Sequence, residues 1–190
     1  MEVIVERRED NKKRFIIIDG SSLMYRAFFA LPLLTSSSGI YTNAIMGFAN
    51  MLGKILTEYK PDNIVVAFDK SRQTFRTQMY AEYKGQREKT PDELKSQMPL
   101  LREFLEALGI AFIEKNNYEA DDIIGTLATK AASQDYEALI VTGDKDALQL
   151  IRPNLKDMLT KRGIMDMQIF AEEAFKEKYA VLEPIKYIDI

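Results

Sequence analysis

The sequence contains no cysteine and no histidine among its 190 residues. The absence of cysteine excludes disulfide bonds, a thiolate zinc site and a cysteine nucleophile. The absence of histidine excludes a Ser-His-Asp triad and the imidazole group that enzymes use most often as a general base. Any metal ion that this chain binds must therefore be held by oxygen ligands, which favours Mg²⁺, Mn²⁺ or Ca²⁺.

The sequence also lacks the long apolar runs of membrane proteins. No run approaches the roughly 18 residues of a transmembrane helix, and the N-terminal stretch MEVIVERREDNKKR has no apolar core of signal-peptide length. We therefore expect a cytoplasmic protein without a membrane partner. Residues 1–13 are expected to form a disordered extension, and residues 14–190 to form one domain.

The spacing of apolar residues predicts strands that alternate with helices. Short β-branched runs are typical of buried strands and occur at 14–20, 62–69, 110–114, 137–142 and 164–170. Helical spacing occurs over 42–60, 90–109, 116–131 and 171–180. The expected N-caps are Thr42, Thr90 and Asn116, and Pro99 is expected to kink or divide its helix. The alternation predicts an α/β fold with a central, mostly parallel sheet that has helices on both faces.

Aspartate stands at or just after the ends of three predicted strands, at Asp19, Asp69 and Asp144. Open parallel sheets bind ligands beyond the carboxyl ends of their strands, so these side chains are expected to converge. Further acids stand two residues after Asp144 and at the head of a predicted helix. The complete set is Asp19, Asp69, Glu119, Asp121, Asp122, Asp144 and Asp146.

The electrostatic cost of such a cluster limits what it can be. Two unit charges 4 Å apart repel by about 4 kcal/mol at an effective dielectric constant of 20. The acids must be dispersed, protonated or neutralised, and we interpret them as a site for divalent metal ions. The alternative is that they are ordinary strand-end and helix-start acids, because Asp is common in turns and acids suit the positive end of a helix dipole.

Positive charge is concentrated in residues 70–95, which we call the basic segment. Its seven Lys or Arg residues and four Asp or Glu residues give it a charge of +3, so the rest of the −3 chain carries −6. Lys and Arg pair with phosphates, and aromatic rings stack on exposed bases. The residues concerned are Phe75, Arg76, Tyr80, Tyr83, Lys84 and Arg87. We interpret the segment as the holder of a phosphate-bearing substrate, with a solvated charged loop as the alternative.

Five motifs, taken in order, resemble the 5′ nuclease domain at the N-terminus of bacterial DNA polymerase I. They are FIIIDGSSLMYRAFFAL, VVAFDKSRQTFR, YKGQR, YEADDIIGTLA and VTGDKDALQL. The resemblance implies a PIN-like or resolvase-like fold with a basic helical arch over the carboxyl edge of the sheet. It also implies hydrolysis of DNA at a 5′ flap, a nick or a free 5′ end, with two Mg²⁺ or Mn²⁺ ions. The expected setting is the bacterial cytoplasm, in association with the nucleoid.

The resemblance also implies roles for individual residues. The expected ligands of a first metal ion, directly or through water, are Asp19, Asp69, Glu119, Asp121 and Asp122, and those of a second are Asp144 and Asp146. Lys84 and Arg87 match the basic residues of the arch that contact the scissile phosphate. The residues that match the substrate channel, and so are expected to bind DNA, are Tyr25, Arg26, Phe75, Arg76 and Tyr83.

The family pattern continues beyond this sequence, with a further aspartate pair and a helix–hairpin–helix that grips duplex DNA. We therefore expect a domain that is incomplete at its C-terminal end, cleaves flap DNA slowly, and belongs to a longer polypeptide with a polymerase domain. Two alternatives remain open. One is a toprim-like or phosphatase-type enzyme, since the DKD sequence fits toprim domains locally; the other is a DNA-binding fragment without activity.

Overall fold

The computed structural model describes residues 12–71, 74–80, 89–161, 163, 166–179 and 183–189. Six strands form one sheet in the order β3-β2-β1-β4-β5-β6. Their bounds are β1 (Arg14–Asp19), β2 (Asn63–Phe68), β3 (Ala111–Glu114), β4 (Glu137–Thr142), β5 (Leu155–Thr160) and β6 (Met167–Phe170). Neighbours are parallel except β6, which runs antiparallel to β5. The expected mostly parallel sheet is confirmed, whereas the expectation for residues 1–13 falls mainly on residues outside the described part.

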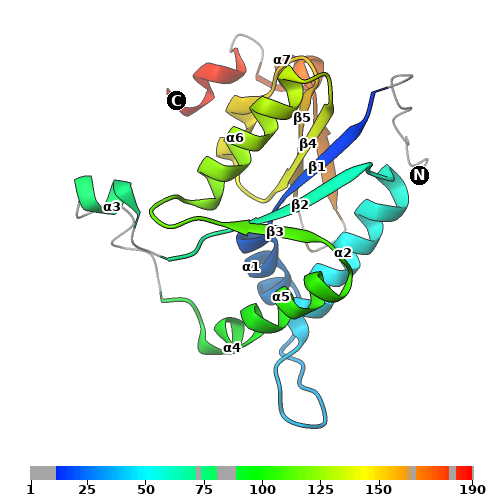
Figure 1. Ribbon diagram of the computed structural model, residues 1–190, viewed down its shortest axis with the longest axis vertical. Coiled ribbons are helices and arrows are strands. Elements are labelled where there is room, and N and C mark those ends of the chain that lie inside the picture. The colour runs from blue at the N-terminus through cyan, green and yellow to red at the C-terminus, as the bar shows by residue number, and fades with distance from the viewer. Residues whose placement is uncertain are drawn as a thin grey trace.

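Helices cover both faces of this sheet (Figure 1). The α-helices are α1 (Gly20–Ala30), α2 (Asn43–Tyr59), α3 (Phe75–Met79), α4 (Asp92–Lys95), α5 (Gln97–Ala107), α6 (Ala120–Ser133) and α7 (Glu172–Tyr179). Two 3₁₀ helices follow β4 and α7, namely η1 (Lys145–Leu150) and η2 (Pro184–Asp189). None of the helices in the described ranges is long and apolar enough to cross a membrane.

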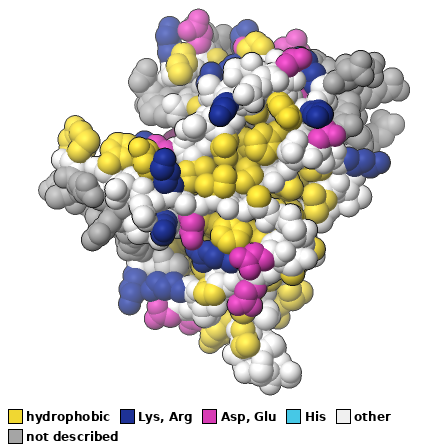
Figure 2. Space-filling model, in the orientation of Figure 1, with side chains coloured by type: hydrophobic (Ala, Val, Ile, Leu, Met, Phe, Trp, Pro, Cys, Tyr) yellow, Lys and Arg dark blue, Asp and Glu magenta, His cyan; other side chains and the backbone are white. Residues whose placement is uncertain are grey.

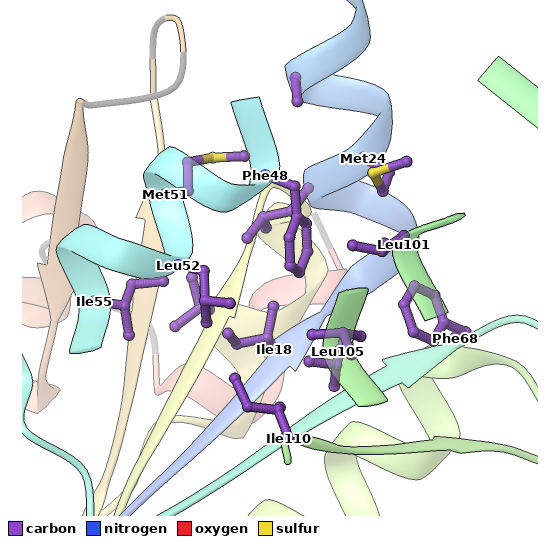
Figure 3. Packing of buried hydrophobic residues seen from close by; sticks show 14 of the residues in the cluster. Ile18, Met24, Phe48, Met51, Leu52, Ile55, Phe68, Leu101, Leu105 and Ile110 are labelled. Carbon is purple, nitrogen blue, oxygen red and sulfur yellow. The ribbon is translucent and has the colours of Figure 1, made fainter. Parts of the chain in front are cut away.

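The larger core lies between the sheet and the layer formed by α1, α2 and α5 (Figure 3). Ile18 of β1 and Phe68 of β2 face this layer, and Phe48, Leu52 and Leu105 pack over them. All five side chains are buried. Apolar burial of this kind stabilises a domain by about 25 cal/mol per Å² removed from water, so this core anchors the strands whose ends carry the acids.

A buried polar network fixes the start of α2 in this core. Thr42 occupies the predicted N-cap position, but its side chain makes no capping hydrogen bond. Instead, Gln97 of α5 accepts hydrogen bonds from the N–H groups of Ala44 and Ile45 and donates one to Asn43. Asn43 in turn donates to the carbonyl of Phe28 in α1. The first turn of α2 is thus satisfied by a side chain that lies far away in the sequence.

The opposite face of the sheet packs against α6. The helical spacing predicted over 116–131 is confirmed for residues 120–131, because Ile124, Ala128 and Ala131 are buried against a cluster that includes Ile17 and Ile140. Beyond α6, hydrophobic side chains gather at the surface over the neighbouring part of the sheet (Figure 2).

Three local predictions differ from the structure. The expected cap at Asn116 is wrong, because Asn117 has a left-handed backbone (φ 67°) and Glu119 is the residue that caps α6. The expected cap at Thr90 is also wrong, since Pro91 occupies the N-cap position. Pro99 does accompany a division of its helix, but the break lies at Ser96, between α4 and α5. Proline cannot donate to the carbonyl four residues earlier and its ring clashes there, which accounts for a break ahead of it.

Neither α1 nor β5 has a counterpart in the sequence prediction. Residues 20–30 form α1, and Asp19 serves both as the last residue of β1 and as the N-cap of this helix. Residues 155–160 form β5, whose charged pair Lys156 and Asp157 interrupts the apolar pattern of a buried strand. Of the strand predicted over 164–170, residues 167–170 form β6.

The contact between α1 and α2 yields a prediction from two glycines of the same helix. A Cβ atom at Gly47 would lie 2.6 Å from the Cβ of Ala27, whereas one at Gly53 would meet nothing within 4 Å. We expect Gly47→Ala to lower the free energy of unfolding by about 1–3 kcal/mol through overpacking. Gly53→Ala should raise it by about 0.5–1 kcal/mol. Urea denaturation of both variants tests this, and a Gly47→Ala variant as stable as Gly53→Ala would contradict the close approach.

Candidate active site

The acids predicted to converge stand where the strand order reverses. β1 is flanked by β2 on one side and β4 on the other, and in open α/β sheets ligands bind at such a reversal, beyond the carboxyl ends of the strands. Asp19 ends β1 at this point. One of its oxygens accepts a 2.9 Å hydrogen bond from the N–H of Ser22, and the other accepts one of 2.9 Å from the hydroxyl of Thr142 at the end of β4.

Asp19 is a buried acid with an unusual protonation equilibrium. Its side chain is 4% exposed, and burial is the main cause that raises its pKa from 3.8 to about 7. The hydrogen bonds from Ser22 and Thr142 lower the pKa, while the charges of Asp121 and Asp69 raise it further. The charges of Asp121 and Asp69 therefore lie close enough to Asp19 to act on its protonation.

Asp69 joins the end of β2 to the start of α6. Its Oδ1 accepts a 2.8 Å hydrogen bond from the N–H of Ala120, and its own N–H donates to the Ser21 hydroxyl at 3.2 Å. These two contacts attach α6 to β2 and α1. The helix that carries Asp121 is therefore positioned directly by Asp69.

Glu119 and Asp122 form a capping box at the start of α6. The Glu119 side chain accepts from the backbone of Asp122, and the Asp122 Oδ2 accepts from the N–H of Glu119 at 3.0 Å. Glu119 is 5% exposed, and its Oε1 also accepts a 3.3 Å hydrogen bond from the hydroxyl of Thr74. The Asp122 carboxylate meets Arg76 through two hydrogen bonds of 2.7 Å.

Asp144 and Asp146 lie in the turn between β4 and η1. Asp144 caps η1, and its Oδ1 accepts a 3.0 Å hydrogen bond from the N–H of Asp146. Between β4 and Asp144, a Cβ atom at Gly143 would lie 2.8 Å from the Ser22 hydroxyl oxygen and 3.1 Å from Arg26. The absence of a side chain at this position lets α1 pack tightly against the turn.

A further acid, Asp157, lies beneath this turn and was not predicted as a site residue. It is paired with Ile140 in the sheet and fully buried, and neither of its carboxylate oxygens has a hydrogen-bond partner in the described structure. Burial, followed by the charges of Asp144 and Asp19, raises its pKa well above the ordinary 3.8, although the nearby Met158 N–H acts in the opposite direction. Asp157 therefore adds to the excess of acid at this end of the sheet.

The acids share an edge without closing on a single point. Among the residues that the structure describes, no three acidic side chains are grouped closely enough to hold one metal ion. Hydrogen bonds and charge interactions nevertheless connect Asp19, Asp69 and Asp121, and Asp144 follows the neighbouring strand. The roles of these acids as metal ligands stay predictions.

The residues predicted to bind DNA are dispersed around the same edge. The hydroxyl of Tyr25 is hydrogen-bonded to Thr90, and Arg26 donates to the carbonyl of Lys161 at 3.0 Å. Phe75 is 37% exposed, and the side chain of Arg76 is 34% exposed. The remaining predicted residues, Tyr83, Lys84 and Arg87, lie outside the described residues, as do the other residues of 81–88, so the expected helical arch stays a prediction.

Comparison with known proteins identifies the family. Residues 14–180 match the family described as 5′-3′ exonuclease, N-terminal resolvase-like domain. The chain belongs to this family. It is 50% identical to the DNA polymerase I of Bacillus caldotenax and 48% identical to that of Bacillus subtilis (strain 168), each over 179 residues. These matches cover 94% of this chain and 20% of each relative, so the chain spans about a fifth of the length of the curated relatives it matches.

Solved structures agree with the fold of a 5′-3′ exonuclease domain. The T5 D15 protein, co-crystallized with metal ions, is 16% identical to this chain with a TM-score of 0.66. The match covers 93% of this chain and 64% of the T5 chain. Flap endonuclease-1 from Methanococcus jannaschii is 18% identical to this chain with a TM-score of 0.54. The match covers 94% of this chain and 62% of the flap endonuclease chain. At these identities the likeness shows the fold, and it confirms the predicted resolvase-like arrangement.

Sequence reasoning about this exonuclease domain missed the residues that surround its acids. Ser22 and Thr142 hold Asp19, and Thr74 holds Glu119. The Asp19–Ser22 spacing is typical of an N-cap and could have indicated α1. Asp157 could have been noticed as a lone acid in LKDMLT, although only the sheet register brings it under the turn that carries Asp144.

Asp157 predicts how stability depends on pH. Because its folded-state pKa is raised, its contribution to stability is fully present below an unfolded pKa near 3.8 and is lost as pH rises through the folded pKa. We expect Asp157→Asn, which cannot ionise, to gain stability relative to the natural chain as pH rises. The gain should reach at most about 1.4 kcal/mol per pH unit within that window.

Urea denaturation between pH 5 and pH 8, with EDTA to remove cations, measures this difference. Asp135→Asn is the matched control, because the Asp135 side chain is 78% exposed and follows the C-terminal end of α6. Its stability should follow the natural chain at every pH. A parallel profile for Asp157→Asn would contradict the buried, ionisable carboxyl group.

Proposed function

We propose that this chain hydrolyses DNA phosphodiester bonds near the 5′ end of flapped or nicked strands, with divalent metal ions. The observation that carries the proposal is the match of residues 14–180 to the family described as 5′-3′ exonuclease, N-terminal resolvase-like domain. The T5 flap endonuclease, one of the structural neighbours, has been crystallised in a pseudo-enzyme-product complex with DNA and metal ions. Its likeness in fold supports the same class of substrate here.

The donor set of this chain suits Mg²⁺ or Mn²⁺, because the available ligands are carboxylate oxygens. When bound, divalent cations lower the pKa of a coordinated water and offset charge on the reacting phosphate. We propose two ions, the first held by residues at the ends of β1 and β2 and at the start of α6, and the second by the turn after β4. The residues are Asp19, Asp69, Glu119 and Asp121 for the first and Asp144 and Asp146 for the second.

The separation of the acids defines how they would act. Since no three described carboxylates are grouped closely enough for one ion, we propose that several act through intervening water or rotate inward on binding. Burial, with smaller contributions from the charges of Asp121 and Asp69, raises the pKa of Asp19 to about 7, so that in the absence of a cation this carboxyl is partly protonated near neutral pH. Binding of a divalent ion to this chain should therefore release protons near neutral pH.

The basic segment would hold the substrate. We propose that Lys84 and Arg87 contact the phosphate, and that Tyr25, Arg26, Phe75, Arg76 and Tyr83 lie along the path of the strand. Charged and aromatic side chains in this combination bind single-stranded DNA through phosphate contacts and base stacking. The bacterial relatives are named DNA polymerase I, and this chain spans about a fifth of their length, so we propose a polymerase domain in the same polypeptide. We also propose a place in the bacterial cytoplasm, in association with the nucleoid.

The family match removes the toprim-like and phosphatase alternatives, because the chain belongs to a different family of enzymes. Binding of DNA without cleavage is the remaining alternative. A protein that only binds DNA would use the same residues to hold the strand as a nuclease but would not cleave it. A cleavage assay therefore also decides between these two functions.

The first test of the proposal is cleavage of a labelled 5′-flap oligonucleotide. We expect cleavage in Mg²⁺ or Mn²⁺ and none in EDTA. Asp69→Asn should lower the rate by more than about 100-fold. Replacing a residue that only supports a metal ligand costs up to about 100-fold in activity, and a ligand itself should cost more. Asp135→Asn should cleave at the natural rate. Cleavage by Asp69→Asn at the natural rate would contradict the site, and binding without cleavage in Mn²⁺ would select the DNA-binding alternative.

The second test measures metal binding through stability. A ligand that binds only the folded state stabilises it by mass action, by about 2.7 kcal/mol at a concentration 100 times its Kd. We expect Mn²⁺ to raise the melting temperature of the natural chain and of Asp135→Asn. Asp69→Asn should show a much smaller rise. An unchanged melting temperature of the natural chain over a full Mn²⁺ titration would show that the acids do not form a metal site.

A further inference from the structure

The first residues of the basic segment that follow β2 are attached to the start of α6. Thr74 forms an isolated parallel bridge with Asn117, and the N–H of Phe75 donates to the carbonyl of Asn117 at 3.0 Å. The Thr74 hydroxyl donates to Glu119. Figure 1 shows α3 standing out beyond the carboxyl ends of the strands, so these contacts are where the protruding segment meets the body of the domain.

Arg76 and Asp122 form the strongest contact in this junction. Two parallel hydrogen bonds of 2.7 Å join the guanidinium to the two carboxylate oxygens. The side chains are 34% and 21% exposed, so water screens the pair less than it would a fully exposed one. The guanidinium also lies 4.6 Å from the centre of the Phe75 ring, and that ring packs against Tyr118 at 5.9 Å. Forked pairing of this kind specifies orientation as well as adding energy.

The Asp122 carboxylate is largely occupied by these partners. Its two oxygens provide about four lone-pair positions. Arg76 uses two of them, and the N–H of Glu119 uses a third. Asp121 differs, because its charge raises the pKa of Asp19 whereas Asp122 is not among the causes of that shift. Successive helical residues point about 100° apart, which agrees with Asp121 facing the other acids and Asp122 facing the basic segment.

We propose that Asp122 is a positioning residue rather than a metal ligand, and that its pairing with Arg76 fixes the base of the basic segment on the helix that carries Glu119 and Asp121. The inference rests on the proposed function, since it explains how groups that bind phosphate are held in register with groups that bind metal. Misplacement by about 1 Å can cost on the order of 100-fold in rate. An anchor at this junction therefore has a direct effect on cleavage.

The decisive experiment requires neither metal nor DNA. In EDTA, amide hydrogen exchange at Phe75 reports whether its hydrogen bond to Asn117 persists. We expect Arg76→Gln and Asp122→Asn each to accelerate this exchange about fivefold, the effect of losing one well-formed ion pair. The double variant should exchange no faster than either single variant, because both changes remove the same contact.

Asp92→Asn is the matched control. Asp92 also begins a helix and pairs with a basic side chain, Lys95 at 2.7 Å, but its side chain is 81% exposed. Exchange at Phe75 should not change in this variant. Unchanged exchange in Arg76→Gln and Asp122→Asn, or fully additive acceleration in the double variant, would overturn the proposal.

Metal binding separates positioning from ligation. The rise in melting temperature with Mn²⁺ should be the same in Asp122→Asn as in the natural chain, and much smaller in Asp69→Asn. A loss in Asp122→Asn as large as that in Asp69→Asn would make Asp122 a ligand and overturn the inference. If the natural chain shows no rise, the proposed metal dependence fails, and the exchange measurements still decide whether the pair anchors the segment.

Discussion

Parallel strands that end together bring their last side chains together, and in this chain those side chains are carboxylates that repel one another. The neighbouring contacts offset this repulsion one acid at a time. Asp19 accepts from the N–H of Ser22, Asp69 from that of Ala120, and Asp144 from that of Asp146. Each donor lies in the first turn of a helix, where N–H groups lack partners within the helix. The same contacts that reduce the repulsion therefore also position α1, α6 and η1.

The amino-terminal end of the sheet shows that the chain can pair its buried charges. There, Arg14 and Glu137 lie on adjacent strands, are 5% and 8% exposed, and form a bond of 2.7 Å. At the other end, Asp157 is buried without a hydrogen-bond partner among the described residues, and Asp19 has only neutral ones. Burying unpaired acids costs stability. This imbalance at one end of the sheet is consistent with a need for cations at that end.

The sequence predicts the strands that carry the site better than the contacts around it. Apolar runs indicate β1, β2 and β4, and the stripe of α6 is readable from its spacing. β5 escapes prediction because Asp157 breaks its apolar run. The cap of α6 was misplaced because a left-handed backbone at Asn117, three residues before the helix, cannot be read from residue types alone. The network of Gln97 with α2 and the pairing of Arg76 with Asp122 depend on tertiary packing, so local patterns do not contain them.

Two consecutive acids at the start of α6 interact with different parts of the molecule. Asp121 and Asp122 are adjacent, yet the charge of one acts on Asp19 while the other meets Arg76. The hydrogen bond from Ala120 to Asp69 fixes this first turn against β2, and the contact of Phe75 with Asn117 fixes the basic segment against the residues just before it. A displacement of the turn would move both sets of contacts together. The start of α6 thus couples the position of the acids to the position of the segment that is proposed to hold DNA.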